Sequence, residues 1–114
     1  MSLVADKVHE LLIGAFPFAR IVKEYSIEYK GKRMFVDFFL PSYSIAVEVH
    51  GQQHDKFVQH FHVDEAGWRN HRYRDRAKEE WASLNNITLV IIHENEVPKT
   101  KEGLIGLIEE VCYG

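Results

Sequence analysis

The stretch MFVDFFLPSYSIAVEVH, from Met34 to His50, alternates between the two faces expected of paired strands. Proline and serine residues interrupt it at positions 41–44, which predicts a turn between strands over 34–40 and 45–50. The side chains expected on the apolar face of this hairpin are Met34, Val36, Phe38, Leu40, Ile45, Val47 and Val49.

One carboxylate falls on the other face of each predicted strand. If residues 41–44 form the turn, Leu40 pairs with Ile45 and Asp37 pairs with Glu48, with their Cβ atoms about 5 Å apart. Like charges in this position destabilise a hairpin, and a divalent cation between them would offset the repulsion. Mg²⁺ prefers such oxygen ligands. The alternatives are that one acid pairs with an arginine or that the register differs.

The flanking sequence predicts three helices and two further strands. Apolar periodicity and stop signals indicate helices ending near Ile13, spanning 65–84 and beginning at Pro98. Strands are expected over 25–29 and over 87–93, the second as a central strand. The inward side chains expected on the long helix are Ala66, Tyr73, Ala77, Trp81 and Leu84. The resulting order, αβββαβα, predicts an α/β (α+β) fold with a mixed sheet flanked by helices.

Composition limits the class of protein. The 114 residues suit one domain, and no Pro- or Gly-rich linker divides the chain. The single cysteine, Cys112, cannot form a disulfide within the chain. No apolar run is long enough to span a membrane, and the start lacks the pattern of a signal peptide. We expect a cytoplasmic, intracellular protein without membrane partners, and a phage or bacterial source would suit it.

Charge is unevenly distributed along the chain. The net charge of −3 argues against a protein that holds nucleic acid through bulk charge alone. The segment 69–78 departs from this average, because Asp75 is its only acidic residue. Its basic residues are Arg69, Arg72, Arg74, Arg76 and Lys78. We interpret Arg72, Arg74 and Arg76 as candidate contacts to DNA phosphates, against the alternative of a solvated helix face.

The order of polar motifs resembles a known family. Asp37 followed by Glu48-Val49-His50 is similar to the PD-(D/E)xK nuclease pattern, with histidine at the usual lysine position. Other segments extend the similarity: Glu10 near the end of the first helix, EVHGQQH at 48–54, NHRYRDR at 70–76 and LVIIHE at 89–94. Together they resemble the very-short-patch repair endonucleases and the homing endonucleases named for their E, D, H, D residues. His93-Glu94 stands where those enzymes have Trp-Glu.

The resemblance implies a restriction-endonuclease-like core and Mg²⁺-dependent hydrolysis of DNA, with Mn²⁺ as a substitute. Carried over residue by residue, it implies that Glu10, Asp37, His54 and Asp75 lie in the site, beside Glu48. The zinc ligands of the mismatch-repair members cannot be completed, because Cys112 is the only cysteine.

Roles follow from the chemistry of these side chains. Asp37 and Glu48 are expected to bind the metal, with the carbonyl of Val49 as a further ligand. His54 lies beyond the strand break at Gly51, and a histidine near neutrality can accept a proton from attacking water. His50 is the rival for this role, since a regular strand points it to the face of the two acids.

Two other classes of function remain open at this point. A nuclease-like fold that binds nucleic acid or a protein partner without cutting is favoured by the missing lysine. A zinc-stabilised interaction module would use the clustered histidines His50, His54, His60 and His62. The acidic balance predicts weak DNA binding by the domain alone, so a homodimer or a separate DNA-targeting module is expected.

Overall fold

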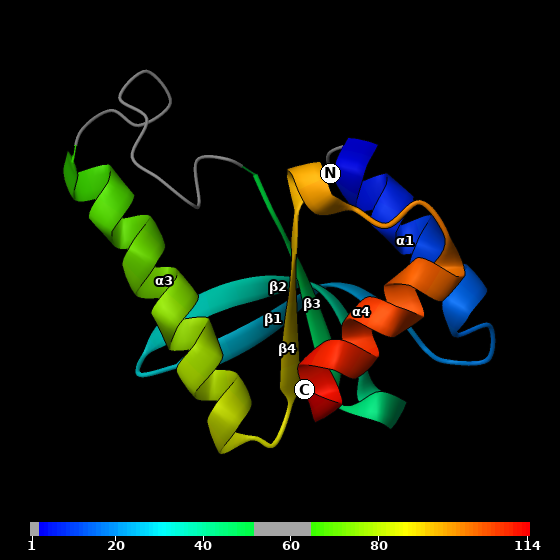
Figure 1. Ribbon diagram of the computed structural model, residues 1–114. Helices are drawn as coiled ribbons and strands as arrows, with labels where there is room; N and C mark the ends of the chain where they lie inside the picture. Colours follow the sequence, from blue (N-terminus) through cyan, green and yellow to red (C-terminus); the bar gives the residue numbers. More distant parts are fainter. Residues whose placement is uncertain (1–2, 52–64) are drawn as a thin grey trace.

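The computed structural model describes residues 3–51 and 65–114, with side chains throughout these ranges except at 65–72. The predicted order of helices and strands is confirmed (Figure 1). The elements are α1 (Leu3–Ala15), β1 (Val22–Tyr29), β2 (Lys32–Leu40), β3 (Ile45–His50), α3 (Glu65–Leu84), β4 (Thr88–His93) and α4 (Lys101–Tyr113), with 3-10 turns η1 (Pro41–Tyr43) and η2 (Glu94–Glu96).

The four strands form one mixed sheet in the order β1-β2-β3-β4. Strands β1, β2 and β3 pair antiparallel, and β3 and β4 pair parallel. The predicted hairpin register is confirmed, since Leu40 pairs with Ile45 and Phe38 with Val47. The prediction of a central final strand is wrong, because β4 is at the edge of the sheet. Its apolar sequence reflects burial between helices on both faces, which does not require a strand on each side.

Helices cover both faces of the sheet, with α1 and α4 on one side and α3 on the other (Figure 1). Each side has its own cluster of buried residues. The α1/α4 core consists of Ala5, Val8, Leu11, Leu12, Phe38, Leu40, Ile45, Val47, Val90, Ile92, Leu104 and Ile108. The α3 core consists of Ile27, Met34, Val36, Ala46, Ala77, Trp81 and Ala82.

Strand β2 changes sides at Asp37, which corrects the expectation of one continuous apolar face. Met34 and Val36 belong to the α3 core, whereas Phe38 and Leu40 belong to the α1/α4 core. Asp37 has no partner in the described pairing of β2 with β1 or with β3, whereas the next residue, Phe38, pairs with both strands. Opposite this gap, Glu24 has a left-handed φ of 49°. Where a residue of a strand is not hydrogen-bonded to its neighbours, the strand can rotate, and the regular alternation of side chains between the two faces is interrupted.

Helix α3 buries two of the four predicted inward residues whose side chains are described. Ala77 and Trp81 are buried, but Tyr73 and Leu84 are 46% and 71% exposed, and the side chain of Ala66 lies outside the described residues. Ala82 is buried instead. Within the residues described, no helix is long and apolar enough to cross a membrane.

Candidate active site

The carboxylates of Asp37 and Glu48 meet where β2 and β3 stop pairing. The backbone N–H of Asp37 donates to Glu48 Oε1 at 3.1 Å, and the N–H of Val49 donates to Asp37 Oδ2 at 2.8 Å. Each carboxylate therefore accepts a backbone donor that the interrupted ladder leaves without a carbonyl partner. The two acids are neighbours, as the hairpin register predicted.

Lys78 reaches this pair from α3. Its Nζ lies 3.0 Å from Glu48 Oε2, and the side chains of the two residues are only 15% and 6% exposed. Lys78 stands one helical turn before the buried Ala82, which turns it toward the sheet. The sequence alone distinguishes Lys78 only as one basic residue of the segment 69–78. The structure thus brings a lysine to the two acids from a different element than the pattern specifies.

His50 occupies the same face of the sheet. It is buried, and its Nε2 lies 3.6 Å from Glu48 Oε2, so it adjoins the carboxylate more loosely than Lys78 does. Its ring meets that of His93 edge-on, with centroids 6.0 Å apart. The sequence placed His50 on the face of the two acids, and the structure agrees. Glu48 and His50 are the buried polar side chains among the described residues.

The two acids differ electrostatically. Burial raises the pKa of Asp37, and the neighbouring charge of Glu48 raises it further, against the hydrogen bond from Val49. Burial also acts to raise the pKa of Glu48, but His50 and Lys78 outweigh it, and the pKa is lowered from its ordinary value. Glu48 already has a cationic partner, whereas the Asp37 carboxylate is disfavoured in its charged form. A cation placed beside Asp37 would relieve that cost.

This donor set fits Mg²⁺. Mg²⁺ is commonly held by one or two carboxylates and completes its octahedron with water or phosphate oxygens. Asp37 and Glu48 supply two such carboxylates. Within a strand the N–H and C=O of one residue point the same way, so the carbonyl of Val49 faces the side of Asp37. In the part of the chain that the structure describes, no group of three His, Cys, Asp or Glu residues forms a cation site.

The remaining predicted residues are less closely joined to this pair. Glu10 is exposed on α1, which packs in the α1/α4 core on the other side of the sheet, and no described hydrogen bond or ion pair links it to Asp37 or Glu48. Asp75 is half-buried on α3, three residues before Lys78 and thus on the same side of the helix.

The predicted DNA contacts separate on α3. Arg74 is exposed and lines a hollow together with Lys78. Arg76 is exposed on another side of the helix, beside Tyr29 and Glu80. The side chain of Arg72 lies outside the described residues, as do His54, His60 and His62.

Two viral proteins match part of the chain. Uncharacterized protein 307L of Invertebrate iridescent virus 6 is 40% identical over 65 residues, which cover 57% of this chain and 30% of that protein. Uncharacterized protein 033L of Invertebrate iridescent virus 3 is 33% identical over 70 residues, which cover 61% of this chain and 34% of that protein. The chain spans about a third of the length of these curated relatives. No family model and no solved structure matches it.

Proposed function

We propose that this domain is the catalytic part of a Mg²⁺-dependent endonuclease that hydrolyses phosphodiester bonds in DNA. The observation that carries the proposal is the ion pair between Lys78 Nζ and Glu48 Oε2, 3.0 Å apart, at a glutamate whose other oxygen accepts a hydrogen bond from the backbone of Asp37. Two acids and a lysine are the residues of the PD-(D/E)xK pattern that the chain resembles. The α+β order with a mixed sheet also supports a restriction-endonuclease-like core.

Each residue has a role that its chemistry allows. Asp37, Glu48 and the carbonyl of Val49 would hold the ion, which when bound polarises a phosphate and lowers the pKa of water. Lys78 presents an ammonium group to the negative charge that develops on the phosphate, and Glu48 fixes its position. His54 stays the sequence's candidate for the general base, and His50 remains the rival beside Glu48.

The proposed partner is DNA. Arg74 extends the positive charge of Lys78 along one side of α3, since residues four apart on a helix are neighbours. A net charge of −3 provides little bulk attraction for DNA, so a homodimer or a separate targeting module would add affinity. Mn²⁺ is expected to substitute for Mg²⁺ in the oxygen-donor site.

One observation favours a second candidate, a binding module that does not cut. Both oxygens of Glu48 already accept hydrogen bonds, one from the backbone of Asp37 and one from Lys78. Such a satisfied carboxylate can be a structural element. Each carboxylate oxygen has a second lone pair, however, so these bonds leave room for a cation.

Cleavage of supercoiled, single-stranded and branched DNA with Mg²⁺, Mn²⁺ or EDTA tests the proposal. We expect cleavage with either metal, none with EDTA, and none with Asp37→Asn or Glu48→Gln. Glu110→Gln, which removes an exposed carboxylate on α4, is the matched control and should cleave normally. Wild-type activity in purified Asp37→Asn would exclude this site. A wild-type protein that binds these DNAs and cuts none of them would establish the second candidate.

A further inference from the structure

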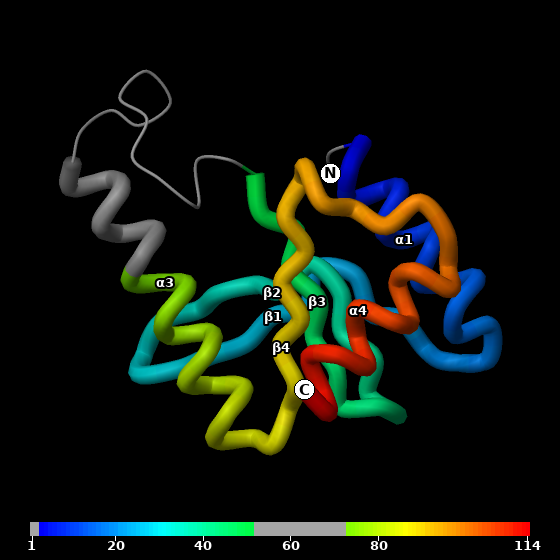
Figure 2. The backbone as a smooth tube through the Cα atoms, viewed as in Figure 1, coloured from blue at the N-terminus to red at the C-terminus, as the bar shows by residue number. Residues whose placement is uncertain are grey.

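The tip of the β1–β2 hairpin lies beside α3 (Figure 2), and a hollow of about 200 Å³ is formed between them. Its lining residues are Tyr29, Lys30, Tyr73, Arg76, Ala77 and Glu80. Lys32 adjoins them, because its Nζ lies over the Tyr73 ring, 4.5 Å from the ring centre. We call these seven residues the hairpin–helix hollow.

The side chains of the hollow belong to one side of the sheet. Tyr29 and Lys32 are partners across the hairpin, so they point to the same face. Tyr29 donates a hydrogen bond to Glu80 Oε2 at 2.8 Å, and Lys32 covers the Tyr73 ring, so both strands reach the helix on this face. Positions 73, 76, 77 and 80 are three or four residues apart and therefore lie on one side of α3. The hairpin and the helix thus present one continuous surface.

Positive charge exceeds negative charge in the hairpin–helix hollow. Lys30, Lys32 and Arg76 are basic, and Glu80 is the only acidic residue of the seven. Glu80 is engaged by Lys30, whose Nζ lies 3.6 Å from Glu80 Oε2. Among the described residues, neither Lys32 nor Arg76 forms an ion pair with a carboxylate. In a chain with a net charge of −3, this local excess of positive charge indicates an anionic ligand.

The turn at the tip of the hairpin contains an unusual residue. Lys30 and Gly31 have φ angles of 51° and 77°, so both central residues of this two-residue turn are left-handed. Asparagine, aspartate or glycine is preferred at the first of these positions, and a lysine costs stability there. The ion pair with Glu80 offsets little of this cost, because its side chains are 64% and 44% exposed. Charge at the hollow, rather than stability of the turn, therefore accounts for the lysine at position 30.

The size of the hollow limits which anion it can hold. Sites for small organic ligands begin at roughly 300 Å³, so a hollow of about 200 Å³ has room for a phosphate group but not for a whole nucleotide. Lysine, arginine and tyrosine are among the side chains that contact DNA phosphates. We propose that the hairpin–helix hollow binds a backbone phosphate of DNA, with Lys30, Lys32 and Arg76 as its cationic contacts.

This phosphate is distinct from the one that is cut. Arg76 and Lys78 are two positions apart on α3 and therefore face different sides of the helix. The hollow thus positions the duplex and leaves the chemistry to Asp37 and Glu48. The inference rests on the proposed function and adds to it a contact surface that is independent of sequence, because phosphate contacts fix the orientation of a duplex without reading its bases.

The first test measures binding by fluorescence anisotropy in EDTA, with labelled DNA duplexes of two unrelated sequences over a series of salt concentrations. Each phosphate contact contributes about 0.9 to the slope of log K against log salt. The double variant Lys32→Ala/Arg76→Ala should therefore reduce the slope by about 1 and weaken binding by about tenfold in about 0.1 M salt. Both sequences should be affected equally. Single-turnover cleavage at saturating protein in Mg²⁺ should keep the wild-type rate.

Lys30→Asn separates binding from stability. An Asn-Gly turn suits the left-handed geometry better than Lys-Gly, so the variant should melt at a temperature no lower than that of the wild type. It should nevertheless bind both duplexes more weakly, because one cation is lost. Wild-type binding by Lys30→Asn would overturn the role assigned to this lysine.

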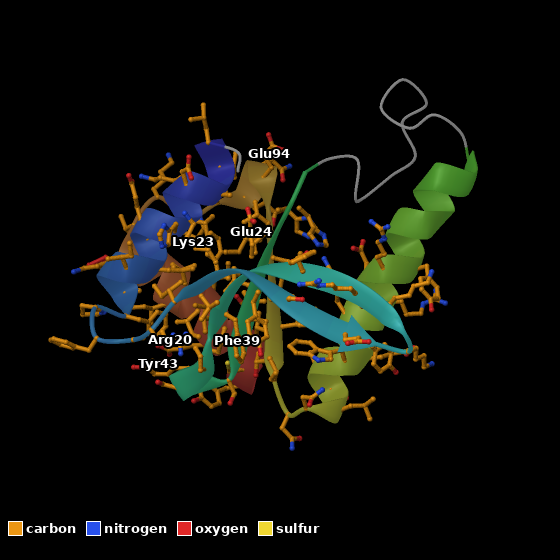
Figure 3. The ribbon with its side chains drawn as sticks, turned by 180° about the vertical axis from the view of Figure 1, so that it is seen from behind. Arg20, Lys23, Glu24, Phe39, Tyr43 and Glu94 are labelled. Atoms are coloured by element: carbon orange, nitrogen blue, oxygen red, sulfur yellow. The ribbon has the colours of Figure 1, made fainter. Side chains whose placement is uncertain are left out.

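A matched control removes the same charges elsewhere. Lys99→Ala changes an exposed lysine, and Arg20→Ala changes an exposed arginine that Figure 3 shows far from α3. The double variant of these two has the same net charge as Lys32→Ala/Arg76→Ala and should bind like the wild type. Equal binding by the two double variants would overturn the inference. Because the metal is chelated, the expected binding without any cleavage in Mg²⁺ would overturn only the proposed function.

Discussion

The two faces of the sheet are built differently. Among the residues whose side chains the structure describes, the α1/α4 core contains twelve buried residues, all of them apolar. The described part of the α3 core contains seven, three of which are alanines, and the buried polar residues Glu48 and His50 lie on its side. The first face is therefore apolar as far as it is described, whereas the second also contains a lysine, a histidine and two acids.

This difference suggests that the α1/α4 side of the sheet mainly stabilises the fold, whereas the α3 side contains the candidate site. Burial of apolar surface is the main favourable contribution to folding, and among the described residues the α1/α4 side buries the larger number of apolar side chains. Buried charges lower stability unless they are paired, so the α3 side needs Lys78 beside Glu48. The tip of the β1–β2 hairpin packs beside α3 (Figure 2), where Tyr29 donates a hydrogen bond to Glu80 at 2.8 Å.

The largest expected effect lies in the α1/α4 core. Leu12 is fully buried on α1, and Leu12→Ala should lower the free energy of unfolding by about 2–5 kcal/mol. Ile13→Ala changes the neighbouring residue, which is half exposed, and should cost much less. Urea unfolding followed by circular dichroism measures both.

Cleavage per folded molecule should be unchanged in Leu12→Ala. If the folded Leu12→Ala variant lost cleavage activity, the separation of the two faces into a stabilising side and a catalytic side would be wrong. In that case α1 takes part in the site, as the resemblance implies through Glu10.

The next effect concerns Lys78 on the α3 side. Lys78→Met should lower the cleavage rate by about 10²–10³-fold, the usual loss when one group that stabilises a developing negative charge is removed. Single-turnover cleavage at saturating Mg²⁺ measures it. Lys99→Met removes an exposed lysine and is the control.

A second measurement separates this role from a structural ion pair. Lys78→Met should tighten Mn²⁺ binding in calorimetry, because a competing positive charge leaves Glu48. Unchanged cleavage in the folded variant would show that Lys78 serves only to neutralise Glu48.

The sequence predicted the hairpin well because its signal is local. Alternation and a four-residue turn set the register, and the register alone brings Asp37 to Glu48. Lys78 was missed because its contact depends on how α3 is rotated over the sheet, and five basic residues in the segment 69–78 offered no means of choosing. The edge position of β4 is not predicted for a similar reason. An apolar strand sequence indicates that the strand is buried, but it does not show whether helices or neighbouring strands cover it.

The change of side in β2 at Asp37 is also not predicted by the local sequence pattern. A strict period of two assigns Val36 and Phe38 to one core, and they lie in two. The sequence clue was Asp37 itself, a charged residue inside an apolar strand. The sequence pattern indicates a ligand at this position, but it does not show that Asp37 also lacks a partner in the described strand pairing.

The smallest effect distinguishes the two acids by their pH dependence. The pKa of Glu48 is lowered in the folded protein, so its charge stabilises the fold above the ordinary pKa of glutamate, and this stability is lost as pH falls through the lowered value. Glu48→Gln should therefore lower the free energy of unfolding at neutral pH, by about 1–3 kcal/mol, because Lys78 loses its partner. The difference from the wild type should shrink in acid.

Asp37 should behave in the opposite way. Its pKa is raised, chiefly by burial, so the protonated form stabilises the fold below the ordinary aspartate pKa of about 4, and this stability is lost as pH rises through the folded value. Asp37→Asn keeps an oxygen for the Val49 N–H and removes the charge. It should raise the free energy of unfolding at neutral pH by up to about 1 kcal/mol, a modest figure because the group is partly solvated. Thermal melts in EDTA between acid and neutral pH measure the difference, which should vanish in acid. If Asp37→Asn and Glu48→Gln destabilised the protein alike at neutral pH, Asp37 would already be stabilised as an anion within the chain. The electrostatic reason for a cation between the two strands would then be lost.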